Sequence, residues 1–491
     1  MARTSIVPSL RIRTLVDAPP QSQRDWVLYW MTAFRRPHSN FALDRALEWA
    51  RDLGKPLVIL EAVRQHYPWA CDRFHRFLID GMIDNQEAFR DHPVLYYPYL
   101  EPKPGKGHGL ARALADQACV LVSDDFPCFF HPTLYERIVA RYPVRVELID
   151  SNGILPMRAT DRTFTVAHSY RRYMQKEVVH HWNTFPKEKP FASIEIPRLH
   201  ELPTSITRRW PCTDLQPFKD RNASLSRFSI DHEVAPTDDV GGHREAQKRL
   251  QSFLRTKLDR YDEDRNEPDE LGSSRLSPYL HFGHISAHQI FRSILHRVEW
   301  VEANVGKPNG KVDGFWNAGR SAEAYLDQLL TWREIGFNMC WREPNYDRYE
   351  SLPAWAQQTL QDHARDRRPW VYELEQFENA TTHDPLWNAA QRQLVRDGII
   401  HNYLRMLWGK KILHWSASPQ EALRIMIHLN NKYALDGRDP NSYSGIFWVL
   451  GRYDRAWGPE REIFGKIRYM TSESTASKWH VKKYLQLFGG E

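Results

Sequence analysis

The chain has 491 residues, of which 42% are hydrophobic and 26% charged, a balance that indicates globular domains with buried cores. Its formal net charge of +6 is mild, so the charge permits a polyanionic partner without requiring one. The cysteines form no CxxC pair, which argues against a disulfide framework and a zinc or iron–sulfur site; they are Cys71, Cys119, Cys128, Cys212 and Cys340. The N-terminus lacks the apolar run of a signal peptide, and no stretch is long enough to span a membrane. We therefore expect a cytoplasmic protein with no metal site.

The first part of the chain alternates predicted strands with predicted helices. Residues 1–22 form a polar leader, and the apolar run Trp26–Met31 is typical of a buried strand. Further apolar runs predict strands over 56–63, 94–100, 118–125 and 144–150. This alternation predicts an α/β domain over residues 23–182, built on a doubly wound parallel sheet. No GxGxxG motif follows the first strand, so the usual dinucleotide fingerprint is missing.

Two helices are predicted between these strands. The first runs from about Asn40 to residue 52, with Ser39 or Asn40 as its N-cap and Gly54 beyond its end. The second is longer and covers about 69–91. Both helices are expected to cover the sheet.

The chain changes character after residue 182. Prolines at short intervals, among them Pro186, Pro190, Pro197, Pro203, Pro211 and Pro217, mark residues 183–239 as an irregular linker over the surface. From residue 240 onwards the apolar period becomes helical, as in the shared face of Ala246, Leu250, Phe253 and Leu254. We therefore predict an all-α domain over residues 240–491.

Three tryptophans lie on two neighbouring helical segments of this domain. Trp408 and Trp415 are seven residues apart, so on a helix they share one face. Trp387 lies on the preceding segment, which Asp384 and Pro385 would begin as N-cap and first residue. Three such indoles could pass electrons by short hops. From spacing alone they are more often core residues, because indoles bury large areas.

The sequence around these tryptophans closely resembles the class II cyclobutane pyrimidine dimer photolyases, which are flavoenzymes that use light to repair DNA. The blocks LWNAAQ, RMLWGKKILHW, LNNKYALDGRDPN and FGKIRYM occur in the family's order and spacing. The resemblance is dense over about the last 230 residues and looser before them. It implies the photolyase–cryptochrome architecture, an α/β domain followed by a helical FAD-binding domain.

A candidate FAD-phosphate motif precedes the blocks. Gly272, Ser273 and Ser274 lead into a predicted helix, where free backbone N–H groups and hydroxyls suit a diphosphate. Alone, such a helix start is more often only an N-cap. The resemblance implies that FAD is contacted by Tyr261, Ser273, Ser274, Arg275, Leu276 and Ser277.

The resemblance also assigns residues to the flavin ring. Arg405 and Asp436 match the family's buried pair beside the isoalloxazine, where a cation favours the reduced anionic ring. Asn430 matches the asparagine beside flavin N5, and Gly437 and Arg438 complete the predicted contacts. Without the resemblance, this stretch would be interpreted as a solvated turn.

The implied chemistry is electron transfer from excited, reduced FAD to a cyclobutane dimer, after which the electron returns. The three tryptophans would reduce the resting cofactor under light. By resemblance Trp408 is proximal to the flavin, Trp387 is in the middle, and Trp415 is the exit.

The substrate must leave the duplex, because a stacked dimer cannot reach a buried flavin. Trp332 and Trp448 match tryptophans that pack against the flipped dimer, and Met406 matches a thioether contact. Arg468 matches the arginine that braces the vacated duplex, while Arg265 belongs to a basic rim for phosphates. UV-damaged DNA is therefore the expected partner of a monomeric enzyme.

One position departs from the family. The family has two glutamates where this chain has Asp327 and Gln328, and an amide at residue 328 can donate a hydrogen bond but no acidic proton. Three hypotheses therefore stay open: a photolyase, a cryptochrome-like photoreceptor without repair, and a helical DNA-binding protein without cofactor. Whether an antenna chromophore binds, and which one, also stays open.

Overall fold

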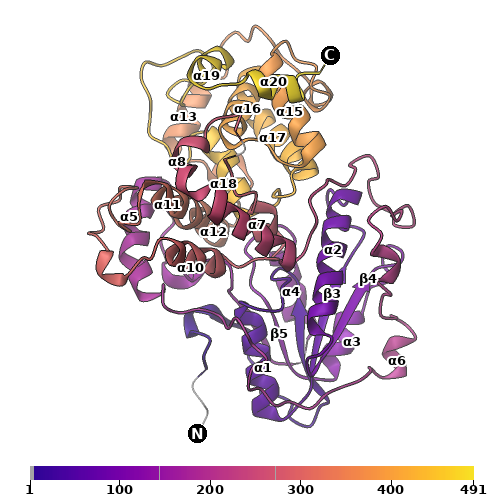
Figure 1. Cartoon of the computed structure of the whole chain (residues 1–491). Coiled ribbons are helices and arrows are strands. Elements are labelled where there is room, and N and C mark those ends of the chain that lie inside the picture. Colours follow the sequence, from indigo (N-terminus) through magenta and orange to yellow (C-terminus); the bar gives the residue numbers. More distant parts are fainter. Residues whose placement is uncertain (1–4, 143, 271, 491) are drawn as a thin grey trace. The chain divides into compact units, whose positions relative to one another are not determined.

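The computed structural model describes residues 5–142, 144–270 and 272–490 (Figure 1). The chain divides into two compact units that interleave along the sequence. Unit 1 contains the chain up to Thr160 together with His180–Arg249 and Leu276–Ile290, and unit 2 contains the other segments. The segment Asp161–Val179 thus belongs to unit 2, although the sequence placed most of it in the N-terminal domain. The predicted domain bounds themselves stay a prediction.

Unit 1 is built on a six-stranded sheet with the order β1-β6-β5-β2-β3-β4. Its strands are β1 (Ile12–Val16), β2 (Trp26–Met31), β3 (Leu57–Val63), β4 (Val94–Leu100), β5 (Ala118–Asp124) and β6 (Val146–Ile149). All neighbours pair in parallel except β1, which is antiparallel to β6. The predicted α/β class is confirmed. The prediction that residues 1–22 are only a polar leader is corrected, because β1 lies within them and forms an edge of the sheet.

Helices cover both faces of this sheet. They are α1 (Phe41–Leu53), α2 (Asp72–Phe89), α3 (Leu110–Asp116) and α4 (His131–Arg141). The predicted caps of α1 are confirmed: the Asn40 side chain accepts from two backbone N–H groups, and Gly54 adopts a φ of 60°. Leu60 packs in a core with α3, whereas the adjacent Glu61 faces the other side and accepts a hydrogen bond from Asn85 of α2 at 2.9 Å.

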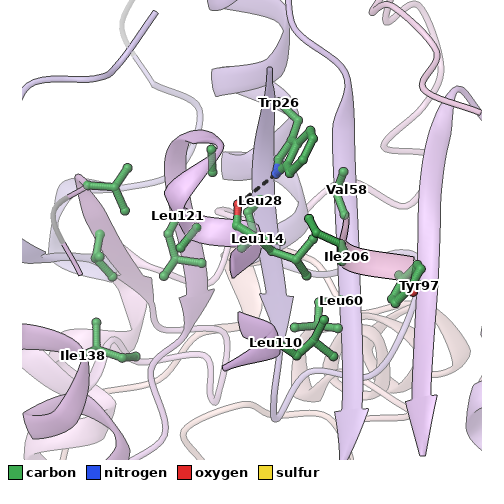
Figure 2. Close-up of a cluster of buried hydrophobic side chains, with 14 of the residues drawn as sticks. Trp26, Leu28, Val58, Leu60, Tyr97, Leu110, Leu114, Leu121, Ile138 and Ile206 are labelled. Carbon is green, nitrogen blue, oxygen red and sulfur yellow. Dashed lines mark hydrogen bonds between the residues drawn. The ribbon is translucent and has the colours of Figure 1, made fainter. Parts of the chain in front are cut away.

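Figure 2 shows the core on one side of the sheet, where side chains of β2, β3 and β5 meet those of α3 and α4. The Trp26 indole N–H donates to the Leu114 carbonyl at 3.1 Å, so its one polar atom is satisfied inside the core. The predicted surface linker also enters this core. Its short helix α6 (Thr204–Thr207) buries Ile206 there, and Trp210 follows. Residues 183–239 are therefore partly a structural element of unit 1.

Unit 2 is helical and has no β-strand among its described residues. The helices of the predicted all-α domain are α7 (His243–Thr256), α8 (Tyr261–Asp264), α9 (Ser277–His281), α10 (Ala287–Arg297), α11 (Arg320–Leu326), α12 (Arg333–Arg342), α13 (Ala354–Asp362), α14 (Leu374–Glu378), α15 (Pro385–Asp397), α16 (Asn402–Trp415), α17 (Pro419–Tyr433), α18 (Pro440–Val449), α19 (Ser472–Lys478) and α20 (Lys482–Phe488). Of these, α9 lies in unit 1, and α7 and α10 begin in unit 1 and end in unit 2. Unit 2 also takes α5 (Ala167–Glu177) from the earlier part of the chain. Within it, α16 packs against α15, α17 and α18 (Figure 1). Over the described ranges, no helix is both long and apolar enough to cross a bilayer.

Candidate functional site

Helix α15 begins where the sequence predicted, and its cap fixes the first tryptophan. The Asp384 side chain accepts the Trp387 backbone N–H at 3.0 Å, and Pro385 occupies the first turn, where a missing N–H costs nothing. Asp384 also receives the Lys411 ammonium of α16 at 3.4 Å. This carboxylate therefore ties the start of α15 to α16, which carries the other two tryptophans.

The three tryptophans are buried, and Trp387 contacts each of the other two. The Trp387 indole N–H donates to the Trp408 carbonyl at 3.0 Å, and its ring lies 6.1 Å from the Trp415 ring, centroid to centroid. The Trp408 indole N–H donates to the Gln391 side chain at 2.9 Å. Trp387 thus touches the Trp415 ring and the Trp408 backbone, while its middle place in an electron path stays a prediction.

The outer end of this ladder differs from expectation. Trp415 was expected to be an exit, yet only 1% of it is exposed. His383 and Tyr372 cover its ring at centroid distances of 4.9 Å and 5.8 Å. The reason is tertiary, because the segments before α14 and before α15 both pack on Trp415 at the end of α16, which spacing within α16 cannot reveal.

The predicted arginine–aspartate pair forms beside the ladder. Arg405, one turn before Trp408 on α16, donates to the Asp436 carboxylate at 3.0 Å. Its Nε is buried and has no hydrogen-bond partner among the described residues. A half-buried guanidinium whose Nε donor is buried without a partner fits an acceptor from a bound ring, since proteins rarely leave a buried donor without a hydrogen bond.

The turn after α17 is held close to that helix. Asn430 is buried and donates to the Ser442 hydroxyl at 3.2 Å. A Cβ at Gly437 would lie 2.7 Å from the Asn430 carbonyl, so only glycine allows this approach. Arg438 adopts a φ of 62°, a strained conformation for a bulky residue, and is itself buried against Asn431. The tight turn thus fixes Asp436 relative to Asn430, and the buried Arg438 holds the turn in place through its bond to Asn431.

The predicted phosphate motif has an unusual backbone. Arg275 adopts a φ of 54°, and left-handed residues outside glycine are enriched where successive N–H groups form anion-binding concavities. The Ser274 hydroxyl receives the Tyr325 phenol at 2.8 Å, and the Tyr325 ring packs on Tyr261 at 5.0 Å. The Arg265 guanidinium lies 5.9 Å from the Tyr261 ring. The structure therefore brings together the unit 2 members of this motif.

The remaining members, Leu276 and Ser277, start α9 and belong to unit 1. Helix α9 has only five residues, so its contribution is free N–H groups rather than a long helix dipole. Ser273 and Ser277 are exposed, which leaves their hydroxyls accessible.

The predicted substrate residues Gln328 and Trp332 lie on a π-helical segment, η7 (Asp327–Trp332). Such segments are rare and occur frequently at functional sites. The neighbouring Asp327 is buried and forms a two-point ion pair with Arg171 of α5, at 2.6 and 3.0 Å. Gln328 is half-buried, and no described side chain hydrogen-bonds to its amide. The segment thus has one carboxylate neutralised internally and one amide available to a ligand.

Two cations lie near the Trp448 ring, and neither contact follows from the spacing of the residues in the sequence. The Lys410 ammonium lies 4.8 Å from its ring centroid, and the Arg468 guanidinium lies 5.8 Å away. Lys410 is fully buried and donates to the Val449 carbonyl at 2.6 Å, and burial lowers its pKa to about 7. A lysine inside the apolar run LWGKKIL was the available signal for this residue. Met406, by contrast, is half-buried on α16.

The arrangement suits a flat, polyanionic cofactor better than a metal. The Arg405 Nε donor without a partner lies on the helix that carries Trp408 and Trp415, whereas the described residues include no group of three or more His, Cys, Asp or Glu that could hold a metal ion. The residues present therefore fit FAD: the Arg405 guanidinium and the Asn430 amide for its ring, and the Arg275 turn for its phosphates.

Comparisons with known proteins show the family of the chain. No family model matches the chain. A bacterial class III photolyase from Agrobacterium tumefaciens has a similar fold, with a TM-score of 0.64 at 16% identity over 95% of this chain and 86% of that one. A deoxyribodipyrimidine photo-lyase of Methanothermobacter thermautotrophicus is 32% identical over 98% of both chains. Those of Potorous tridactylus and Arabidopsis thaliana are 31% and 30% identical, over 95% and 99% of this chain and 82% and 94% of theirs. The chain therefore belongs to the deoxyribodipyrimidine photo-lyase family.

Proposed function

We propose that this protein is a class II-type photolyase, which binds FAD and uses light to split cyclobutane pyrimidine dimers in UV-damaged DNA. The observation that carries the proposal is the position of Trp387, in contact with both Trp408 and Trp415 while Arg405 lies one turn before Trp408. Core packing alone does not require a cofactor cation and an indole ladder on the same helix. The names of the full-length relatives support the same substrate.

The residues that would hold the cofactor divide into two groups. Arg405, Asp436 and Asn430 would hold the isoalloxazine ring, with Gly437 and Arg438 fixing the turn that carries Asp436. The segment from Ser273 to Ser277 and Tyr261 would hold the phosphates and the adjacent sugar. When bound, FAD supplies light absorption and the electron that opens the cyclobutane ring.

The tryptophans would carry electrons toward the cofactor, with Trp408 nearest to it and Trp387 between Trp408 and Trp415. Their burial excludes water and shields the indoles from side reactions. Repair by an enzyme that is already reduced would not need them.

The substrate side would be formed by the π-helical segment and Trp448. Trp332 and Trp448 would stack on the flipped dimer, and Met406 would contact it. Gln328 would donate an amide hydrogen bond to a base carbonyl, and because it carries no acidic proton it would orient the dimer without protonating it. Arg468 and Arg265 would contact the DNA itself.

A cryptochrome-like photoreceptor is the second candidate, and Gln328 is the observation that favours it. The family's carboxyl at this position is replaced by an amide with no partner among the described side chains. Such a protein would keep the flavin and the ladder but would not repair DNA.

Absorption spectroscopy and a repair assay test the proposal together. Purified protein is expected to show flavin bands and to release FAD on denaturation. Chemically reduced protein is expected to split dimers in an oligonucleotide under blue light but not in the dark. A colourless protein would refute the cofactor assignment, and a flavin-loaded protein without repair would favour the photoreceptor.

A further inference from the structure

The tryptophan ladder ends inside the protein. Trp415 is 1% exposed, and the Lys411 ammonium lies 5.0 Å from its ring centroid. That ammonium is already paired with the Asp384 carboxylate at 3.4 Å, so the burial of the ring is what disfavours a positive charge on it, because the site lacks the screening of water. An oxidised Trp415 is therefore a poor end point, and no external reductant can touch it.

A second group of rings continues from Trp415 to the surface. The His383 ring lies 4.9 Å from the Trp415 ring, centroid to centroid. The Trp370 ring stacks on the same His383 ring, at a centroid distance of 4.6 Å and an interplanar angle of 22°. Trp370 is 50% exposed. The rings thus form a continuous path of contacts from a buried indole to one that solvent reaches.

The segment that carries Trp370 is fixed to the end of α16. Arg368 donates to the Leu413 and His414 carbonyls at 2.9 and 3.0 Å, and the Tyr372 backbone N–H donates to the Trp415 carbonyl at 2.9 Å. These bonds satisfy carbonyls at the helix C-terminus, where partners are otherwise missing. Trp370 therefore keeps its place relative to the ladder.

His383 is fixed in turn. The Tyr372 oxygen accepts the His383 backbone N–H at 3.1 Å, so its own hydroxyl hydrogen is free to donate to His383 Nδ1 at 2.7 Å. This pair of bonds holds the imidazole flat beneath Trp370. Burial is the largest influence on the His383 pKa and lowers it, so the ring between the two indoles is uncharged at neutral pH.

We propose that Trp370 is the surface terminus of the ladder, at which a small soluble thiol supplies electrons. The inference rests on the proposed function. One electron passes from Trp370 to oxidised Trp415, and the exposed Trp370 indole releases its N–H proton to water. A thiol then gives a hydrogen atom to the Trp370 radical, which restores the indole, and two thiyl radicals combine to a disulfide. Exposure favours this end point, because water stabilises the transient charge that the buried Trp415 cannot hold.

Trp370→Phe tests the proposal, with Val371→Ala, at the next exposed apolar position, as the matched control. The Trp370 variant is expected to lose photoreduction by thiols several-fold, while the control keeps the wild-type rate. Both variants should bind flavin normally and repair dimers normally once chemically reduced. A Trp370 variant with the wild-type rate overturns the inference.

Radical trapping supplies a readout that does not depend on activity. Illumination of wild-type protein without thiol, in the presence of a nitroso spin trap, should place the adduct on Trp370 when the peptides are analysed by mass spectrometry. An adduct on Tyr372 or Trp415 instead overturns the inference. Failure of the proposed function is distinguishable, because wild-type protein would then hold no flavin or show no photoreduction at all.

Discussion

Lys410 offers a quantitative test of the site beneath Trp448. Its ammonium is fully buried, its one hydrogen bond runs to the Val449 carbonyl, and burial lowers its pKa from the ordinary 10.5 to about 7. Asp454 attracts the charge and Arg468 repels it, but both effects are smaller than burial. The perturbation is Lys410→Met, which keeps the length of the side chain and removes the ionisable group.

The direction in which folding stability changes with pH follows from the number of protons that each state binds. Between about pH 7 and 10.5 the unfolded chain holds the Lys410 proton while the folded protein releases it, so folding stability rises with pH across this window. Below about pH 7 both states are protonated, and this contribution to the slope vanishes. Each pH unit within the window is worth about 1.4 kcal/mol, so wild type should gain about 2 kcal/mol over Lys410→Met between pH 7 and pH 9. The unpaired Val449 carbonyl adds an offset of about 1–3 kcal/mol that does not vary with pH.

The assay is urea denaturation of both proteins from pH 6 to pH 9, with the difference in free energy of unfolding plotted against pH. Lys307→Met, at an exposed position of unit 2, controls for the loss of one lysine. A difference between wild type and Lys410→Met that stays constant over this range would refute the reasoning and would mean that Lys410 keeps its charge inside the fold.

Three further predictions concern the ladder and the π-helical segment. Trp408→Phe should abolish most photoreduction while leaving repair by chemically reduced protein intact. If the flavin bands of this variant bleach under blue light as fast as those of wild type, the indoles serve only as core residues. Arg171→Ala should cost about 3–5 kcal/mol of unfolding free energy, because it leaves Asp327 buried and unpaired; a loss below about 1 kcal/mol, measured by denaturation, would contradict this. Gln328→Glu should raise the repair quantum yield if acidity matters and leave it unchanged if the residue only orients the dimer, and a fall in yield would contradict both alternatives.

Local features of this protein followed from the sequence by itself. The strand β2 coincides with the predicted Trp26–Met31, and the caps at Asn40 and Gly54 bound α1 as expected. Asp384 likewise begins α15. These features depend on side-chain periodicity and on hydrogen bonds to nearby backbone groups, and a few consecutive residues determine both. The family blocks added the pair of Arg405 and Asp436, whose contact joins α16 to the turn after α17.

Other features were decided only by tertiary structure. The pairing of Arg171 with Asp327 joins residues 156 apart, and the first strand forms an edge of the sheet by pairing with the last. The burial of Lys410 and the cover over Trp415 likewise come from segments distant in the chain. No local period encodes these contacts, because each depends on which surfaces pack together when the whole chain excludes water. The route from the ladder to Trp370 belongs to this second class.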